Sequence, residues 1–334
     1  MTKEALPTAP NGRLHQRLPE GPLAIIGDVH GHHEALDALL RRLGLDPDDP
    51  SHNPGETLIF VGDLVDRGPN SVAVVQRVAQ WVAAGRARMV LGNHEINLLK
   101  NERKSGNKGW FHGLAGRDPI DGKGHNPDYP SYVATPGEKA SMLAFFREQP
   151  LTLQRDDLCV VHAQWDAQAI QQLCKFANVQ GAIEAPPDAT FKAPAHLFQP
   201  TRPAWDGESA EAEAAAQNSN PLSVLTSGAE TVGDHDRMKF AGGRWRQVVR
   251  QPWWEAWDDD RAVVFGHYWR HPTAGDFAGV AIDDGVGPSR NAYCVDFSVG
   301  RRPSHQPGAL AALRWTGTNA PPTVVFDEAD PFRA

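Results

Sequence analysis

Three short apolar runs early in the chain are each followed by a turn rich in Gly, Asp, Asn and His. The runs are Leu23-Ala24-Ile25-Ile26, Leu58-Ile59-Phe60-Val61 and Arg88-Met89-Val90-Leu91, and segments with helical periodicity separate them. This alternation is typical of a sheet covered by helices. We therefore predict an α/β fold whose polar turns follow the carboxyl ends of strands, where such sheets present ligand groups.

The pattern continues along the 334-residue chain with two interruptions. A Gly-, Pro- and Asn-rich excursion spans 105–136, and an irregular insertion or cap with partial helix is expected over 180–260. The length fits one domain, predicted over 23–334, after a loose lead-in over 1–22. Further strands are expected at 151–154, 158–161 and 262–265, and runs near 279–282, 292–295, 309–315 and 323–326 indicate a second sheet packed on the first.

Charge and composition argue against several classes of protein. The formal net charge of −8 disfavours broad binding to nucleic acid, which needs a basic surface. No apolar run approaches the ~20 residues of a membrane helix, so no membrane attachment is expected. Three scattered cysteines are too few for a disulfide framework, and the first residues lack the apolar core of a signal peptide, so we expect a cytoplasmic protein with reduced thiols.

The turns after the strands carry side chains that bind metals. In extended backbone, Asp28 and His30 project to the same side, so both can reach one ion. A lone Asp or His after a strand is more often a turn residue, but several together make that reading unlikely. Oxygen and imidazole donors without cysteine suit Mn, Fe or Zn. The other turns are Asp63-Leu64-Val65-Asp66-Arg67-Gly68, Gly92-Asn93-His94-Glu95, His162 and Gly266-His267.

In this order, the motifs G-D-x-H-G, G-D-x-x-D-R-G and G-N-H-E, followed by two isolated histidines, resemble the phosphoprotein phosphatase branch of the calcineurin-like metallophosphoesterases. The resemblance covers about Leu23 to Trp315, apart from the insertion. It implies a sandwich of two mixed sheets flanked by helices, with two divalent ions, Mn²⁺ before Fe or Zn. Asp28 and His30 would bind the first ion, Asp63 would bridge, and the second would be bound by Asn93, His162 and His267.

The resemblance also implies catalytic groups beside the metals. Two ions about 3.5–4 Å apart lower the pKa of a bridging water, so we expect in-line attack of a metal-bridging hydroxide on a phosphomonoester. His94 is the expected general acid, because imidazole titrates near neutral pH, and Asp66 would orient it. Arg67 offers a guanidinium fork for phosphate oxygens. Relatives use a second arginine from the insertion, for which Arg237 and Arg244 are the candidates.

Two substrate classes stay open. Asp66 and Glu95 favour activity like that of serine/threonine protein phosphatases, which is the preferred reading. The alternative is nucleotide hydrolysis like that of bis(5'-nucleosyl)-tetraphosphatases. A catalytically silent metal-binding module is disfavoured, because every residue that the resemblance requires is present. The segments that resemble bacterial diadenosine tetraphosphatases are Gly62-Asp63-Leu64-Val65, Arg147-Glu148-Gln149-Pro150-Leu151, His162-Ala163-Gln164-Trp165-Asp166, Tyr293-Cys294-Val295-Asp296 and Ala312-Leu313-Arg314-Trp315.

Two positions depart from the family pattern. Ala163 stands where many relatives have Gly after the histidine. Trp269 stands where the broader superfamily often has the second histidine of G-H-x-H. The loss of this histidine matches the phosphoprotein phosphatase branch and leaves the first metal with fewer protein ligands. Among the other histidines, His235 would approach the site only if the insertion folds back, and a solvated role is favoured.

Overall fold

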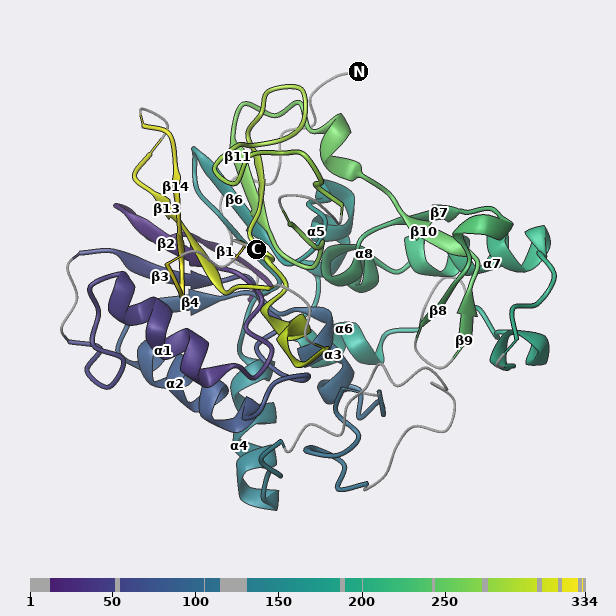
Figure 1. The fold of residues 1–334 in the computed structure, drawn as a ribbon, viewed down its shortest axis with the longest axis horizontal. Coiled ribbons are helices and arrows are strands. Elements are labelled where there is room, and N and C mark those ends of the chain that lie inside the picture. The colour runs from purple at the N-terminus through teal and green to yellow at the C-terminus, as the bar shows by residue number, and fades with distance from the viewer. Residues whose placement is uncertain are drawn as a thin grey trace.

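Two five-stranded sheets form the centre of the computed structural model (Figure 1). The model describes residues 13–51, 55–104, 106–114, 131–186, 190–199, 201–241, 244–271, 276–304, 308–317, 320–329 and 332. In the first sheet, β2 (Leu23–Ile26), β3 (Thr57–Phe60) and β4 (Ala87–Met89) run parallel. Next to β2, β13 (Ala311–Trp315) and then β14 (Thr323–Phe326) complete the sheet with antiparallel pairing.

The second sheet has the order β1-β5-β6-β11-β12. Its pairs are parallel except for the antiparallel pair β5–β6. Both sheets are therefore mixed, as predicted. The strands are β1 (His15–Arg17), β5 (Thr152–Gln154), β6 (Leu158–Val161), β11 (Ala262–Phe265) and β12 (Ala292–Cys294).

Alternate residues along each strand face two different cores. Leu23 and Ile25 of β2 pack in one apolar cluster with Val160 of β6 and Val264 of β11, so the two sheets lie face to face. The alternate residues Ala24 and Ile26 belong to a second cluster that includes helix residues. Because side chains alternate across a strand, this division follows directly from the runs of apolar residues, which are buried on both faces. The predicted two-sheet sandwich flanked by helices is confirmed.

Helices cover the outer faces of the sandwich (Figure 1). Local signals set their starts: Asn70 caps α2 by accepting from Ala73 N at 3.0 Å, and Thr135 and Glu138 form a capping box at α4. The bounds are α1 (His33–Arg42), α2 (Ser71–Ala83), α3 (Asn93–Leu99), α4 (Pro136–Arg147) and α5 (Ala167–Leu173). Among the described residues, no helix has the length and apolar character that crossing a membrane requires. The cytoplasmic location stays a prediction.

The segment expected as an irregular insertion contains regular elements, which lie away from α1 and α2 in Figure 1. A buried carboxylate organises them: Glu213 of α7 accepts from Arg244 Nη2 at 2.6 Å and from Arg246 Nε, and Arg246 also binds Glu230. The elements are α6 (Val179–Glu184), η1 (Ala195–Phe198), α7 (Gly207–Asn218), α8 (Pro221–Ser227), β7 (Glu230–Val232), η2 (His235–Arg237), β8 (Lys239–Ala241), β9 (Arg244–Arg246), β10 (Val248–Arg250) and η3 (Trp253–Ala256).

Three details differ from the sequence-based expectations. The runs at 309–315 and 323–326 extend the first sheet through β13 and β14, instead of forming a second one. The run near 279–282 is not a strand. The lead-in expected to be loose contains β1, which pairs with β5 because Leu14 and Leu18 on either side of it are buried. Residues 1–12 and 115–130 lie outside the described part of the chain.

Substitution of Phe265, at the end of β11, tests the core beneath the second sheet. Its ring is fully buried, 4.9 Å from the ring of Trp253 and stacked on Trp254 at 5.7 Å. Phe265→Ala should lower the free energy of unfolding by about 3–5 kcal/mol, because it removes packed atoms and leaves a cavity. Phe198→Ala, whose ring is 48% exposed, should change it by less than about 0.5 kcal/mol. Urea denaturation of both variants measures this, and equal losses would contradict it.

Candidate active site

Turns after five strands bring the predicted donors to one edge of the sandwich. Hydrogen bonds between these turns hold them together: His30 N donates to Asp63 O at 2.9 Å, and Gly266 N donates to His162 O at 2.8 Å. A Cβ on Gly92 would lie 2.2 Å from Asp63 Oδ1, so only glycine permits this approach. The donors follow β2 (Asp28, His30), β3 (Asp63), β4 (Asn93, His94), β6 (His162) and β11 (His267).

The backbone of these turns is unusual. Eight described non-glycine residues have positive φ, and five of them lie in the site turns, where such conformations concentrate when the surroundings hold them. Their φ values are 48° for His30, 50° for Asp63, 72° for Asp66, 67° for Arg67 and 63° for His267. The strain indicates that the fold positions these side chains at a cost in local stability.

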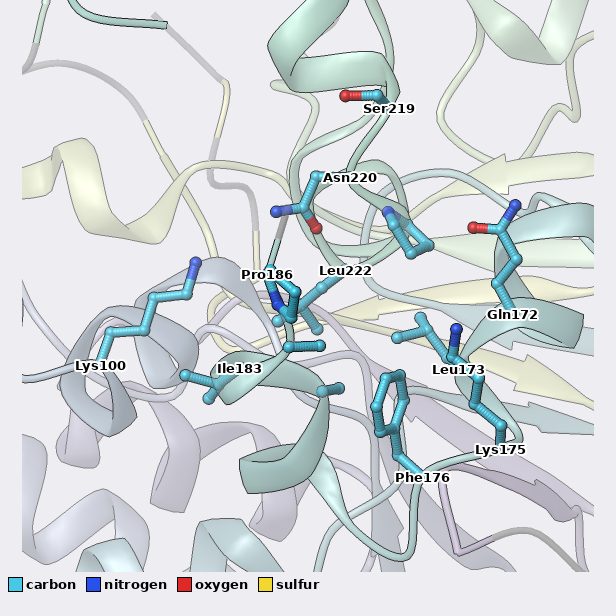
Figure 2. Close-up of a pocket in the computed structure, with 13 residues that line it drawn as sticks. Lys100, Gln172, Leu173, Lys175, Phe176, Ile183, Pro186, Ser219, Asn220 and Leu222 are labelled. Atoms are coloured by element: carbon cyan, nitrogen blue, oxygen red, sulfur yellow. The ribbon is translucent and has the colours of Figure 1, made fainter. Parts of the chain in front are cut away.

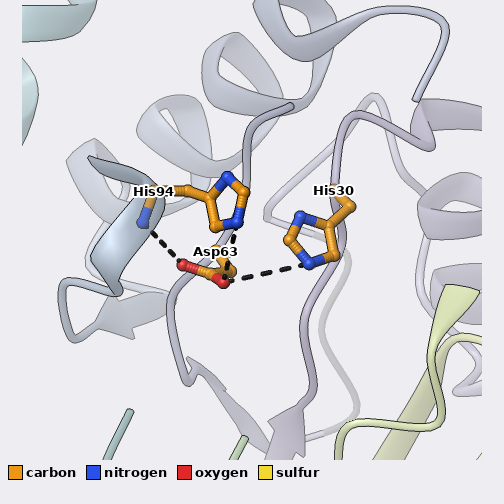
Figure 3. Close-up of side chains that lie close together, drawn as sticks. All are labelled: His30, Asp63 and His94. Carbon is orange, nitrogen blue, oxygen red and sulfur yellow. Dashed lines mark hydrogen bonds and ion pairs between the residues drawn. The ribbon is translucent and has the colours of Figure 1, made fainter. Parts of the chain in front are cut away.

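Two groups of side chains among the described residues could each hold a metal ion. His30, Asp63 and His94 form one, drawn in Figure 3, and Asp63, His162 and His267 form the other. In each group the ligand atoms lie within 4.8 Å of one another. Buried carboxylate and imidazole donors fit Mn, Fe or Zn. Asp63 belongs to both groups, which is the arrangement expected of a bridging ligand.

The two remaining predicted ligands lie beside these groups. The Asp28 carboxylate is 4.0 Å from His30 Nε2 and accepts from His267 N at 3.2 Å. Asn93 Oδ1 lies 3.4 Å from His162 Nε2. The structure thus brings all six predicted ligands together. It adds His94 to the first group, although the sequence predicted an acid and not a ligand there.

Hydrogen bonds to backbone carbonyls orient two of the imidazoles. His30 Nδ1 lies 3.0 Å from Val65 O, and His162 Nδ1 lies 2.8 Å from Val61 O. Each contact leaves Nε2 directed at Asp63, at 3.8 Å for His30 and 3.4 Å for His162. A carbonyl partner of this kind fixes the tautomer and the ring plane of a metal-binding histidine.

Charges within the site move several pKa values. Burial raises the pKa of the Asp63 carboxyl, but the charges of His162 and His94 outweigh it and hold this pKa well below its usual value. Burial, and next the charge of Asp296, raise the pKa of Asp28 well above its usual value. Burial lowers the pKa of His162, but Asp63 raises it more, to about 10. The carboxylate of Asp63 is therefore the negative centre around which the imidazoles gather.

His94 is held by a second carboxylate. Its Nδ1 lies 2.5 Å from Asp66 Oδ2, while Trp110 Nε1 donates to Asp66 Oδ1 at 2.8 Å. Burial lowers the pKa of His94, but the charge of Asp63 and the hydrogen bond to the Asp66 carboxylate raise it above its usual value overall. The Nε2 atom remains directed into the site, 3.7 Å from Asp63 Oδ2. This geometry suits a proton donor that is oriented from behind.

The structure separates the predicted arginines. Arg67 Nη2 lies 3.4 Å from His94 Nε2, at the site. Arg237 is exposed and pairs with Asp234, and Arg244 pairs with Glu213, so neither contacts a donor residue. Arg250, which the sequence did not single out, instead donates to His267 O at 3.0 Å. His235 is likewise exposed beside Asp236.

Comparison with known proteins identifies the family of the domain that carries most of the donors. The model for the calcineurin-like phosphoesterases matches residues 21–179, which include β2, β3, β4 and β6 and the donors that follow them. Residues 21–179 form a calcineurin-like phosphoesterase domain. This family uses divalent metal ions to hydrolyse phosphoric esters, so the chain is a hydrolase of that kind.

Relatives of this metallophosphoesterase include a symmetrical bis(5'-nucleosyl)-tetraphosphatase of Janthinobacterium sp. It is 28% identical over 262 residues, 73% of this chain and 81% of the relative. An asymmetrical bis(5'-nucleosyl)-tetraphosphatase of Bacillus velezensis is 42% identical over 92 residues, 27% of this chain and only 36% of the relative. A protein serine/threonine phosphatase of Saccharomyces cerevisiae shares the fold, with a TM-score of 0.51, 14% identity, and coverage of 93% of this chain and 81% of the other.

Two buried acids of the metallophosphoesterase have roles that its sequence motifs did not reveal. Glu95 accepts from Asp63 N and Gly92 N at 2.9 Å and from Leu64 N at 2.8 Å, so it joins two site turns. Burial, and next the charge of Asp63, raise its pKa to about 7. Asp296 follows β12 beside Asp28, and burial raises its pKa to about 6. In the sequence, Asp296 is marked only as the end of the segment Tyr293-Cys294-Val295-Asp296, directly after an expected strand.

A separate hollow lies at the far end of α3. It has a volume of about 200 Å³, and its lining includes Leu173, Phe176 and Leu222, with Lys100 and Lys175 at opposite sides (Figure 2). Pockets that enclose small molecules are typically about 300–1,000 Å³. None of the residues that line the hollow belongs to either donor group. It is therefore distinct from the metal site.

Glu95→Gln tests whether the joined turns determine metal binding. The amide keeps the shape but places an N–H₂ group against backbone N–H donors, which should lower the free energy of unfolding by about 1–3 kcal/mol. The displaced Asp63 should then hold less metal. Elemental analysis after dialysis measures the metal content, with the exposed Glu211→Gln as control. Full metal content and activity in Glu95→Gln would show that the turns keep their geometry without this carboxylate.

Proposed function

We propose that this metallophosphoesterase hydrolyses bis(5'-nucleosyl) polyphosphates, with a tetraphosphate such as diadenosine tetraphosphate as the model substrate. The observation that carries the proposal is the similarity to a symmetrical bis(5'-nucleosyl)-tetraphosphatase over most of both chains. The sequence alone preferred a phosphoprotein substrate and kept nucleotides as the alternative. The relatives' names favour that alternative, and the likeness to a protein phosphatase concerns the fold alone.

The donor geometry supports a pair of divalent ions, most readily Mn²⁺. Asp28, His30 and Asp63 would hold one, and Asp63 would share the other with a second set of ligands, Asn93, His162 and His267. When bound, such ions supply Lewis-acid activation of water and charge neutralisation at the phosphoryl oxygens. The protein fixes their spacing through Asp63 and through imidazoles whose other nitrogens are hydrogen-bonded.

His94 and Arg67 would act on the substrate directly. Protonated His94 would give its Nε2 proton to the oxygen that leaves phosphorus, and Asp66 would orient the ring and favour its cation. Arg67 is exposed beside His94, where its guanidinium would bind oxygens of the reacting phosphoryl group. Arg250 would serve as the second arginine on the His267 side of the site.

In this proposal, residues 23–334 form a single domain, and its insertion over 180–260 has a role in substrate selection. The insertion would form a wall that restricts what reaches the metals. Its contacts support this role: Leu225 O accepts from Ala163 N at 3.0 Å, next to His162, and Arg250 binds His267 O. Loops placed on a rigid scaffold commonly carry selectivity of this kind.

The substrate proposal is tested by comparing two substrates under one metal condition. With Mn²⁺, kcat/KM for diadenosine tetraphosphate should exceed that for a phosphoserine peptide by more than about tenfold, or about 1.4 kcal/mol of transition-state binding. Chelation should abolish both activities, and Mn²⁺ should restore them. Chromatography should show ADP as the product if cleavage is symmetrical. A tenfold preference for the phosphopeptide would instead support the protein-phosphatase reading.

The acid role of His94 is tested by two substitutions. His94→Asn should lower kcat by about 10²–10⁴ with little change in metal content, which separates an acid from a ligand. Asp66→Asn removes an interaction that raises the pKa of His94, so this pKa should fall. The protonated acid would then be lost at lower pH, and the alkaline limb of the kcat profile should shift downward. An unmoved limb, or metal lost in proportion to activity, would rule the role out.

A further inference from the structure

We propose that Arg301, which lies over the ring of Trp269, binds a phosphate beyond the one at the metals and so selects polyphosphate chains over simple monoesters. The inference rests on the proposed function and names a specificity residue for that same site. It starts from the contact between Arg301 and the ring of Trp269.

The contact between these two residues is close. The guanidinium carbon of Arg301 lies 3.9 Å from the centroid of the Trp269 ring. A guanidinium at this distance over an indole face is attracted by the ring and keeps its N–H groups free at the edge. Trp269 comes two residues after His267, so this platform is tied to a donor turn.

The backbone also places Arg301 beside the first donor group. Arg301 belongs to η4 (Val299–Ser304), which packs on His30 so tightly that a Cβ on Gly300 would lie 2.7 Å from His30 Cδ2. Arg301 N donates to Ser298 O at 2.8 Å and anchors the turn. The side chain of Arg301 therefore starts at the residue next to Gly300, which itself contacts the donor His30. Glycine at position 300 is what allows this approach.

Arg301 lacks the partner that its neighbour has. Arg302 binds Asp327 at 2.7 Å and Glu328 at 2.7 Å, and it fastens η4 to the residues after β14. Within the described parts of the chain, Arg301 has no carboxylate in salt-bridge range, and neither has Arg67. Burial, and next the charge of Arg67, lower the pKa of Arg301 below its usual value, and the charge of Asp296 offsets them only in part. The two cations therefore lie near enough to repel. Cations gathered in this way in a protein of net charge −8 suit an anion with several charges.

Geometry and charge together assign different phosphates of the substrate to different arginines. Arg67 and Arg250 lie at His94 and His267 and serve the reacting phosphoryl group. Arg301 lies on the His30 side, where its guanidinium would bind the next phosphate of a polyphosphate chain. A monoester has no second phosphate to bind there. Removal of Arg301 should therefore affect polyphosphates selectively, whereas removal of Arg250 should affect every phosphate substrate.

The test compares Arg301→Gln with the wild-type Mn²⁺ enzyme on two substrates. The value of kcat/KM for diadenosine tetraphosphate should fall by roughly 10- to 100-fold, the loss expected for one charge-assisted hydrogen bond. For p-nitrophenyl phosphate it should change by less than about twofold. Arg250→Gln should lower both alike, and the exposed Arg42→Gln should lower neither. Equal losses on both substrates in Arg301→Gln, or no loss on either, would overturn the proposal.

A second variant and an inhibitor keep this test independent of folding and of the dinucleotide. Trp269→Leu keeps an apolar side chain but removes the platform, so it should reproduce the selective loss, and the double variant should lose little more. Tripolyphosphate, at constant free Mn²⁺, should inhibit aryl phosphate hydrolysis more weakly in Arg301→Gln, with orthophosphate inhibition unchanged. This readout applies even if the wild type does not cleave dinucleotides. Failure to cleave them would refute the proposed function but not the role of Arg301. Additive losses in the double variant, or equal weakening for both anions, would refute the role of Arg301.

Discussion

The site depends on keeping one carboxylate charged inside the sandwich. Burial disfavours the charged form of Asp63, and the imidazoles of His162, His94 and His30 overcome that penalty. A buried charge without such partners costs several kcal/mol, so the turns that carry these histidines are bound to the position of Asp63. Glu95 holds the backbone of Asp63 in turn. Because Asp63 belongs to both donor groups, one residue sets the spacing of the whole centre.

The donors were predictable because each follows its strand directly in the sequence. A run such as Leu58-Ile59-Phe60-Val61 and the Asp63 after it fall within one short window, and the strand predicts where the side chain emerges. Sheet membership is different, since it depends on pairing between distant segments. Strand β13 pairs with β2 in the register Ala312↔Ile26, and nothing near either residue in the sequence indicates the other. The runs at the C-terminal end were therefore assigned to the wrong sheet, although they were recognised as strands.

The same limit explains why the sequence did not identify the second arginine at the site. A basic run such as 237–250 offers several candidates for a phosphate contact, and spacing alone cannot rank them. The structure ranks them by their partners. Glu213, from the helix α7, neutralises Arg244 and Arg246, whereas Arg250 reaches the carbonyl of His267. Arginines that pair with carboxylates remote in the sequence are thus excluded as phosphate-binding candidates. These pairs can be identified only in the folded chain.

The contact between Arg301 and Trp269 has a physical consequence for selectivity. The catalytic turns treat any phosphoryl group alike, because they recognise the reacting phosphorus and its oxygens. Discrimination must come from groups that contact the rest of the substrate, and binding energy obtained there counts only for substrates long enough to reach it. An arginine stacked on Trp269 meets this condition and leaves the chemistry at Asp63 untouched. Selection among phosphate substrates is then made by the number of phosphates in the chain, without any change in the residues that hydrolyse the bond.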